Sequence, residues 1–128
     1  MKTAPQFLKR AAEIMNERAK QYDKPDGERS MGKAIAAFNT VTGRKLRESE
    51  GWLLMLLLKQ VRLFQHPGFH LDSAEDAIAY AALLAEAKQN EHGALWRTMR
   101  QFASAPPDNP TAEEDEAFRK MFLDAKAQ

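Results

Sequence analysis

The stretch ESEGWLLMLLLKQVRLFQHPGFHLDSAEDAIAYAALLAEA, residues 48–87, decides the fold. It holds the most apolar run of the chain, Trp52 to Leu58, and then a Pro-Gly pair at Pro67 and Gly68. Proline and glycine together interrupt a helix, so the stretch predicts two helices joined by a short loop. Because helices joined this closely pack as antiparallel neighbours, we expect an antiparallel helix hairpin at the centre of the protein.

Charged residues lie on the faces that this hairpin would bring together. Residues three or four apart share one face of a helix. On the first helix this rule groups Glu48, Trp52, Met55, Lys59 and Arg62, and on the second it groups Asp72, Asp76, Tyr80 and Leu83. Antiparallel packing then predicts that Arg62 lies near the end with Asp72 and Asp76, with Lys59 about one turn deeper.

Two interpretations of these charges stay open at the level of sequence. A buried charge is costly unless it is paired or used, and such clusters are enriched at functional sites, so the residues are candidates for a site that binds a charged ligand. The alternative is an ion-pair network at the rim of the core. Asp72 also fits a structural role, since Asp-Ser-Ala-Glu before an apolar run resembles a helix-capping pattern.

Composition restricts the class of protein. The 128 residues suit one domain, and 29% charged with 44% hydrophobic residues is ordinary for a soluble globular protein. A net charge of +1 argues against a nucleic-acid or membrane partner. The chain has no cysteine, hence neither disulfides nor thiolate metal ligands. The absence of a membrane-length apolar run and of a signal peptide predicts a cytoplasmic protein.

The N-terminal part of the chain predicts two more helices. One covers residues 5–22, with Leu8, Ala11 and Met15 at helical spacing. The other covers residues 31–42, with Ile35, Phe38 and Val41 expected on its inner face, and Gly43 is the expected residue after its last turn. No stretch has the alternation of a strand, so the predicted fold is all-α, a helical bundle around the central hairpin.

The C-terminal part is expected to be more loosely organised. Residues 88–93 are predicted to end the second hairpin helix, and residues 94–102 to form a separate short helix. A Pro-rich linker follows, then a last helix capped by Thr111, with Phe118, Met121 and Phe122 on its apolar face. We expect residues 1–103 to form the bundle domain and residues 104–128 a linker plus helix, in the same domain or as an arm swapped to another subunit.

Two loops contain candidate ligands. The polar loop of residues 23–30 precedes a helix N-terminus, where backbone N–H groups and the cations Lys24, Arg29 and Lys33 could hold an anion. An ordinary capped turn is the alternative. His66 and His70 flank the Pro-Gly pair, and because that pair breaks the helix we expect exposed loop histidines rather than a metal site.

Two motifs together resemble a known group of proteins. One is R-x-K-x-Y-D-x-P-x-G-E-R-S-M at residues 18–31. The other is the helix G-W-L-L-x-x-L-L-K-x-x-R at residues 51–62 followed by the helix D-S-A-E-D-x-x-x-Y-A-A-L at residues 72–83. The set resembles a family of small helical proteins of tailed bacteriophages and prophages, mostly of unassigned function. The resemblance covers about residues 10 to 88 and implies a phage-encoded protein of the host cytoplasm.

The layout of Lys59, Arg62, Asp72, Asp76 and Tyr80 is also similar, more distantly, to the all-α nucleoside triphosphate pyrophosphohydrolases of the MazG type. This resemblance implies nucleotide binding with Mg²⁺ held by clustered carboxylates. The paired glutamates that those enzymes carry on their first helix are absent here, where the corresponding run is Trp52 to Lys59. Binding of a nucleotide is therefore expected more than its cleavage.

The resulting hypothesis is a nucleotide-binding protein, with a role assigned to each candidate residue. The metal ligands would be Asp72, Glu75 and Asp76; the phosphate ligands Arg29, Lys33, Lys59 and Arg62; and the base-stacking residues Tyr22, Trp52 and Tyr80. The alternative is a non-enzymatic phage protein that binds and modulates a host protein or defence component. The net charge of +1 gives little support to nucleic-acid binding through Arg44, Lys45 and Arg47. A homo-oligomer is expected, because a helix hairpin this apolar in a small chain often packs against its copy.

Overall fold

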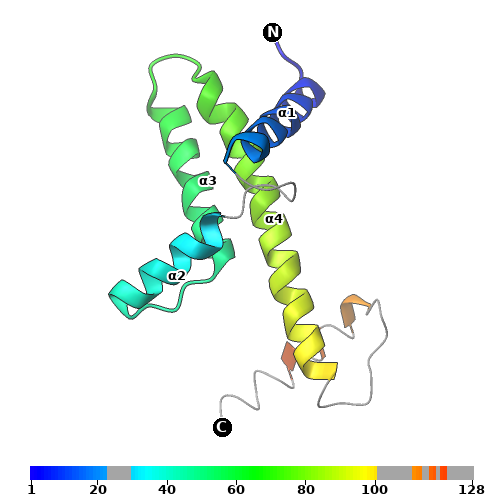
Figure 1. Ribbon diagram of the computed structural model, residues 1–128. Coiled ribbons are helices and arrows are strands. Elements are labelled where there is room, and N and C mark those ends of the chain that lie inside the picture. The colour runs from blue at the N-terminus through cyan, green and yellow to red at the C-terminus, as the bar shows by residue number, and fades with distance from the viewer. Residues whose placement is uncertain (23–29, 101–110, 114–115, 118, 121–128) are drawn as a thin grey trace. The chain divides into compact units, whose positions relative to one another are not determined.

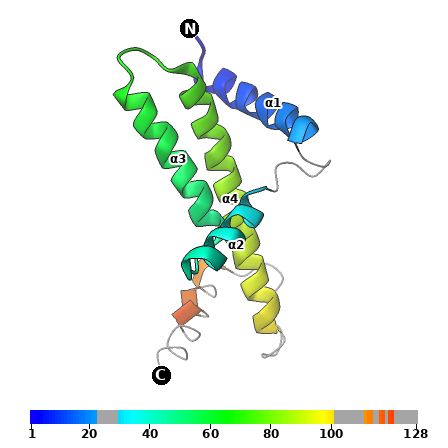
Figure 2. The same ribbon diagram turned by 60° about the vertical axis from the view of Figure 1, so that its left-hand side comes forward.

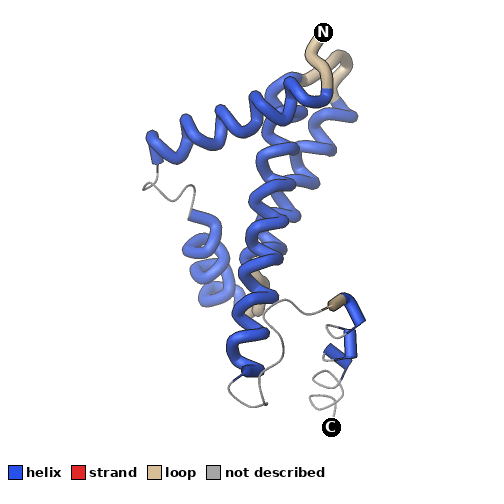
Figure 3. The backbone as a smooth tube through the Cα atoms, turned by 90° about the vertical axis from the view of Figure 1, so that its right-hand side faces the viewer, coloured by secondary structure: helices blue, strands red, loops and turns tan. Residues whose placement is uncertain are grey.

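The computed structural model describes residues 1–22, 30–100, 111–113, 116–117 and 119–120, and its described elements are four helices. They are α1 (Ala4–Tyr22), α2 (Ser30–Thr42), α3 (Glu48–Gln65) and α4 (Leu71–Arg100). Within these ranges no residue is in a strand, as the tube in Figure 3 shows, so the all-α prediction is confirmed. None of the described helices has both the length and the apolar character needed to cross a bilayer.

The chain divides into two compact units, residues 1–91 and residues 92–128. The first unit contains α1, α2, α3 and most of α4. The second begins inside α4, and the predicted last helix is described there only at isolated positions. Phe118, Met121 and Phe122 lie outside the described residues, as does the Pro-rich linker.

In the first unit, α3 and α4 lie side by side (Figures 1 and 2). Contacts between them run in opposite order along the two helices: Ser49 pairs with Glu91, Trp52 with Tyr80 and Lys59 with Asp72. The helices are therefore antiparallel, and the loop of residues 66–70 joins them. In both views α1 lies against α4 near this loop, whereas α2 lies near the start of α3.

The core of the first unit is built from all four helices. Trp52, Tyr80, Leu83 and Ala87 are buried together, and their partly buried neighbours are Met15, Met31, Met55, Leu56 and Leu84. Trp52 and Tyr80 stack with ring centroids 5.7 Å apart and an interplanar angle of 27°. Methionine fills irregular gaps well, which suits a core where four helices meet at different angles.

Gly51 explains how α2 reaches the core. A Cβ atom at this position would lie 2.5 Å from Met31 Sδ and 2.9 Å from Ile35 Cδ1. The glycine therefore allows the first turns of α2 to approach the α3 backbone. The predicted inner face of α2 is wrong beyond Ile35, because Phe38 is 46% and Val41 85% exposed.

The connector between α2 and α3 is fixed by local hydrogen bonds. Gly43 has φ +70°, the left-handed conformation expected of the residue that follows a helix. The Asn39 side chain donates to the Leu46 carbonyl at 2.8 Å and accepts from the Leu46 N–H at 2.9 Å. These bonds set the turn that leads into α3.

The predicted helix break at residues 88–93 is wrong. Helix α4 is continuous from Leu71 to Arg100, and Gly93 does not have the positive φ of a helix-terminating glycine. A single interior glycine costs a helix only about 1 kcal/mol. The neighbouring Lys88, Gln89 and Glu91 are good helix formers, so the sequence around Gly93 can sustain the helix.

Candidate functional site

The main polar feature of the first unit is a set of four side chains that we call the charged cluster: Arg18, Lys59, Asp72 and Asp76. Asp76 is its centre. Lys59 Nζ lies 2.6 Å from Asp76 Oδ2, and Arg18 Nη2 donates to Asp76 Oδ1 at 2.7 Å. Each oxygen of one carboxylate therefore faces its own cation. Asp76 and Lys59 are 3% and 7% exposed, so the ion pair that joins α3 to α4 is largely removed from water, whereas Arg18 of α1 is partly exposed.

The three predicted metal ligands do not act as one group. Asp72 Oδ2 lies 3.3 Å from Lys59 Nζ, but its side chain is 68% exposed. Glu75 is buried and forms an ion pair with Lys2 of the N-terminal segment instead. Asp72 and Asp76 thus share Lys59, whereas Glu75 has a different cation. Across the described part of the chain, no group of three or more His, Asp or Glu side chains is placed to hold a metal ion.

The acidic partners set the protonation of the cations. Burial lowers the pKa of Lys59, but the hydrogen bonds and the negative charges of Asp76 and Asp72 outweigh burial and raise it overall. Burial likewise lowers the pKa of Arg18, and the charge of Asp76 together with Tyr80 reverses that effect. Both side chains are therefore cations throughout the physiological range.

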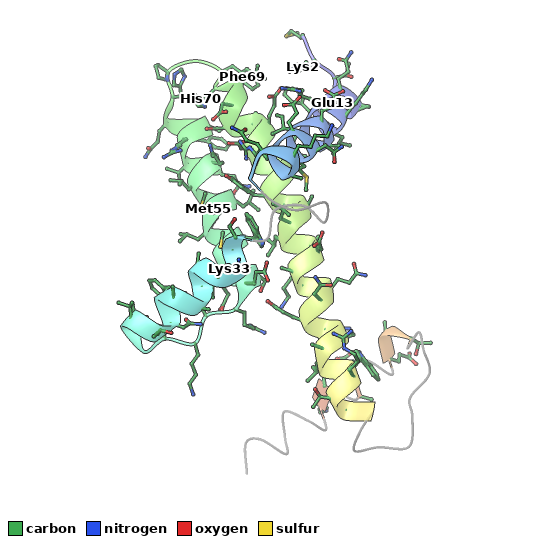
Figure 4. All side chains as sticks on the ribbon, viewed as in Figure 1. Lys2, Glu13, Lys33, Met55, Phe69 and His70 are labelled. Atoms are coloured by element: carbon green, nitrogen blue, oxygen red, sulfur yellow. The ribbon has the colours of Figure 1, made fainter. Side chains whose placement is uncertain are left out.

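The predicted phosphate ligands are spread over the first unit. Lys59 lies in the charged cluster, and Arg62 lies one turn further along α3, exposed and with no ion pair to any described residue. Of these two residues, Lys59 and not Arg62 forms ion pairs with both Asp72 and Asp76. Lys33 is on α2, toward the opposite end of α3 from His70 and Lys2 (Figure 4). Arg29 lies outside the described residues.

The predicted aromatic ligands are mainly core residues. Trp52 and Tyr80 are 2% and 9% exposed and cover one face of each other's ring. The side chain of Tyr22 lies outside what the structure describes. The stack therefore forms the floor below the charged cluster, one turn of α4 beyond Asp76.

Both loop histidines serve the hairpin loop. His70 Nδ1 accepts a hydrogen bond from the Ser73 N–H at 3.2 Å, at the start of α4. His66 Nδ1 lies 3.2 Å from both the N–H and the carbonyl oxygen of Gly68. Their rings lie 4.9 Å apart. The Nδ1 atoms thus order the loop that places α4 beside α3.

The sequence patterns predict no site role for Arg18 or Ser73. Arg18 continues the face of Ala11 and Met15 at helical spacing, and this position on a buried face is the signal that could have identified it. Ser73 is 0% exposed, and within the described part of the chain its Oγ makes no hydrogen bond. Buried hydroxyls usually have a partner, so Ser73 is an unsatisfied polar group one turn before Asp76.

An apolar pocket of about 390 Å³ lies on the same end of the unit. Its lining residues are Ala4, Phe7, Leu8, Phe69, Ala74 and Ile78. Phe7 and Phe69 meet edge to face, 6.2 Å apart, and Lys2 Nζ lies 5.8 Å from the Phe7 ring centroid. Because its walls are apolar, this pocket does not suit a phosphate group, and the charged cluster is the better candidate for one.

Comparisons with known proteins found one family. Its description is "Domain of unknown function (DUF6378)", and it matches residues 6–88. This range contains nearly all of α1, the whole of α2 and α3 and more than half of α4, and with them every member of the charged cluster. A comparison with curated proteins and another with solved structures found no match.

Proposed function

The chain belongs to the DUF6378 family, and we propose that it binds a phosphorylated small molecule of the nucleotide type at the charged cluster. One observation carries the proposal. Lys59 is a buried cation held by one buried carboxylate, Asp76, and by one exposed carboxylate, Asp72. The exposed carboxylate occupies a place that an anion from solution can take.

Exchange at Lys59 is the central step of binding. The contact to Asp72 is 3.3 Å long, whereas the contact to Asp76 is 2.6 Å. A surface ion pair contributes only about 0–1 kcal/mol, so a phosphate oxygen can replace Asp72 at little cost. Asp76 would stay in place and keep Lys59 charged and oriented toward the ligand.

Two further cations support a doubly charged ligand. Arg62 is exposed one turn from Lys59 on α3, and it has no ion pair within the described residues. The Arg18 side chain, which donates to Asp76, is 33% exposed, so it is only partly removed from solvent. A guanidinium binds phosphate through two parallel hydrogen bonds. Arg62 would supply the second contact to the phosphate group.

The proposal does not include the base-stacking and metal-binding roles that the sequence suggested. Since Trp52 and Tyr80 are stacked on each other, we propose no base-stacking role for them. Mg²⁺ prefers several oxygen ligands, and here Asp72, Asp76 and Glu75 are paired with lysine and arginine. We therefore assign charge neutralisation to the cations of the chain, with any Mg²⁺ arriving as the ion of a nucleotide–metal complex. No catalytic step is assigned.

Thermal shift of the full-length protein tests the proposal. The ligands are inorganic phosphate, pyrophosphate and a series of ribo- and deoxynucleotides, each with and without Mg²⁺. A ligand at about 100 times its dissociation constant adds roughly 2.7 kcal/mol to the stability of the folded state. At least one phosphorylated compound should raise the melting temperature by several degrees, and the corresponding unphosphorylated nucleoside should not.

Two exposed cations provide a matched pair of variants. Arg62→Gln should weaken the binding by about tenfold, corresponding to the loss of one charged hydrogen-bonding contact. Lys33→Gln removes the same charge from α2. Gly51, which α2 contacts, lies eight residues from Lys59, roughly 12 Å along α3, so Lys33→Gln should leave binding unchanged. Absence of any shift in a folded sample would contradict the proposal, and equal losses in the two variants would contradict the site.

The alternative of a protein that modulates a host component stays a prediction. Exposure of Phe118, Met121 and Phe122 would support it, but these residues lie outside the described residues. Phage origin and a cytoplasmic location also stay predictions. A group of exposed apolar side chains on α3 does favour a macromolecular contact.

A further inference from the structure

Six large apolar side chains are exposed along one side of α3, and we call them the α3 stripe. They are Leu53, Leu54, Leu57, Leu58, Val61 and Phe64, with exposed fractions between 38% and 87%. Met55 and Trp52 leave the helix on the opposite side and pack in the core. Helix α3 is thus apolar on both sides, and among the described residues the core covers one side, whereas the six side chains of the stripe on the other side are exposed.

We infer that the α3 stripe is the surface through which two copies of this chain pair, with the two α3 helices antiparallel across a two-fold axis. Monomeric soluble proteins rarely leave a contiguous apolar patch of more than a few hundred Å² uncovered. The spacing, area and end charges of the stripe each point to a second copy. This inference does not depend on the proposed ligand site.

The spacing of the stripe is that of a helix-pairing seam. Leu54, Leu57, Val61 and Phe64 are separated by three, four and three residues, which are the a and d positions of a heptad repeat. Leu53 and Leu58 lie immediately beside this seam. Four apolar layers with the same face on both partners form a self-complementary surface, which a two-fold axis requires.

The area of the stripe is sufficient for a specific dimer. The exposed fractions of the six side chains together equal about three fully exposed large apolar residues. At roughly 150–200 Å² for each such residue, one copy contributes about 500 Å². Complete coverage of each stripe by the other would bury about 1,000 Å² in total, which is the lower bound for a specific interface. Contacts of the flanking polar residues would add to that area.

The charges at the ends of the stripe favour the antiparallel orientation. Glu50 continues the seam toward the N-terminus, four residues before Leu54, and its side chain is 42% exposed. Parallel pairing would bring Glu50 against Glu50 of the second copy and align the two helix dipoles unfavourably. Antiparallel pairing separates the two glutamates. It places Leu54 against Phe64 and Leu57 against Val61 of the second copy.

Solution mass is the first test. We expect the full-length protein to be a dimer by light scattering and by sedimentation equilibrium at micromolar concentration. Leu54→Lys and Val61→Lys should each raise the dimer dissociation constant by at least about tenfold, because each puts two charges into the apolar seam. Val41→Lys is the matched control: it adds the same charge at an exposed apolar residue on α2, and it should leave the dimer intact.

Cysteine pairing is the second test, and the chain suits it because it has no native cysteine. Under mild oxidation Leu54→Cys mixed with Phe64→Cys should form a disulfide between the two variants. Leu54→Cys alone should not, because antiparallel pairing separates the two copies of residue 54 by ten residues, roughly 15 Å along the helix, beyond the reach of a disulfide.

The outcomes are distinct. A monomer at all concentrations would overturn the inference, as would a dimer that withstands both stripe variants. A dimer in which Leu54→Cys links to itself would overturn the antiparallel orientation. Loss of nucleotide binding in the screen would leave each of these readouts unaffected, so the two proposals fail independently.

Discussion

Asp76 holds Lys59 at 2.6 Å in a site where neither residue is more than 7% exposed. Arg18 occupies the other oxygen of the same carboxylate. One side chain on α4 thereby ties α3 and α1 to it, close to the stacked rings of Trp52 and Tyr80. The first unit is stabilised at this end by one carboxylate as well as by apolar packing.

Asp76→Asn should destabilise the first unit by about 3 kcal/mol, because it leaves two cations with reduced compensation in a desolvated site. Urea denaturation followed by circular dichroism measures the change. Asp72→Asn is the control. Its side chain is 68% exposed, so its loss should cost less than about 1 kcal/mol. If the two substitutions lowered the free energy of unfolding equally, the burial of Asp76 would not be the reason for its contribution to stability.

Gly51→Ala should destabilise the protein by about 1–2 kcal/mol. The added methyl group must displace Met31 and Ile35, and overpacking typically costs more than the roughly 1 kcal/mol that alanine adds to helix propensity. Gly32→Ala provides the comparison, because its nearest neighbour is Glu48 Oε2 at 3.5 Å. That variant should be neutral or more stable. Chemical denaturation of both variants in parallel decides whether α2 approaches α3 this closely.

Gly93→Ala should stabilise the protein by up to about 1 kcal/mol. In the structure this residue is inside α4, and nothing lies within 4 Å of an added Cβ, so only the gain in helix propensity remains. If Gly93 ended the helix in the left-handed conformation, Gly93→Ala would instead lower the stability of the protein. Thermal and urea unfolding of this single variant therefore distinguish the continuous helix from the helix break that the sequence suggested.

Glu91→Gln should lower stability at neutral pH, with an effect that shrinks in acid. Burial raises the pKa of Glu91, but hydrogen bonds from the hydroxyl and the N–H of Ser49, at 3.0 and 3.1 Å, outweigh it and lower the pKa overall. The ionised group therefore adds stability above its unfolded pKa of about 4.3. This contribution disappears as pH falls through the lowered value in the folded state.

Denaturation of wild type and Glu91→Gln at pH 7 and near pH 3 measures this difference. A difference in stability between the two proteins that is the same at both pH values would mean that the charge of Glu91 has no role in holding the start of α3 against α4.

Local patterns in the sequence were sufficient to predict most helices. The Pro67-Gly68 interruption separates α3 from α4, and Gly43 follows α2 with the expected positive φ. Gly93 misled the prediction, because a glycine can either end a helix or continue it at a small cost. Whether the helix ends or continues at Gly93 depends on the helix propensities of the neighbouring residues, and their combined free energy is too small to judge from composition.

The charged cluster was only partly predictable. Helical spacing identified Lys59, Asp72 and Asp76 as neighbours, because antiparallel packing fixes which ends of α3 and α4 meet. It could not show that Glu75, next to Asp76, turns to Lys2, or that Arg18 enters from α1. Both facts depend on the angle at which α1 lies against α4, and no spacing rule within one helix determines that angle.

The two tryptophans give this chain a built-in pair of optical probes. Trp52 is stacked on Tyr80 in the first unit, and Trp96 donates to His92 Nε2 at 2.8 Å in the second. Because there is one in each unit, the fluorescence of Trp96→Phe reports on the first unit and that of Trp52→Phe on the second. Helix α4 runs through both units. The emission of these two variants therefore shows, without an attached dye, whether the two units unfold together in one cooperative transition.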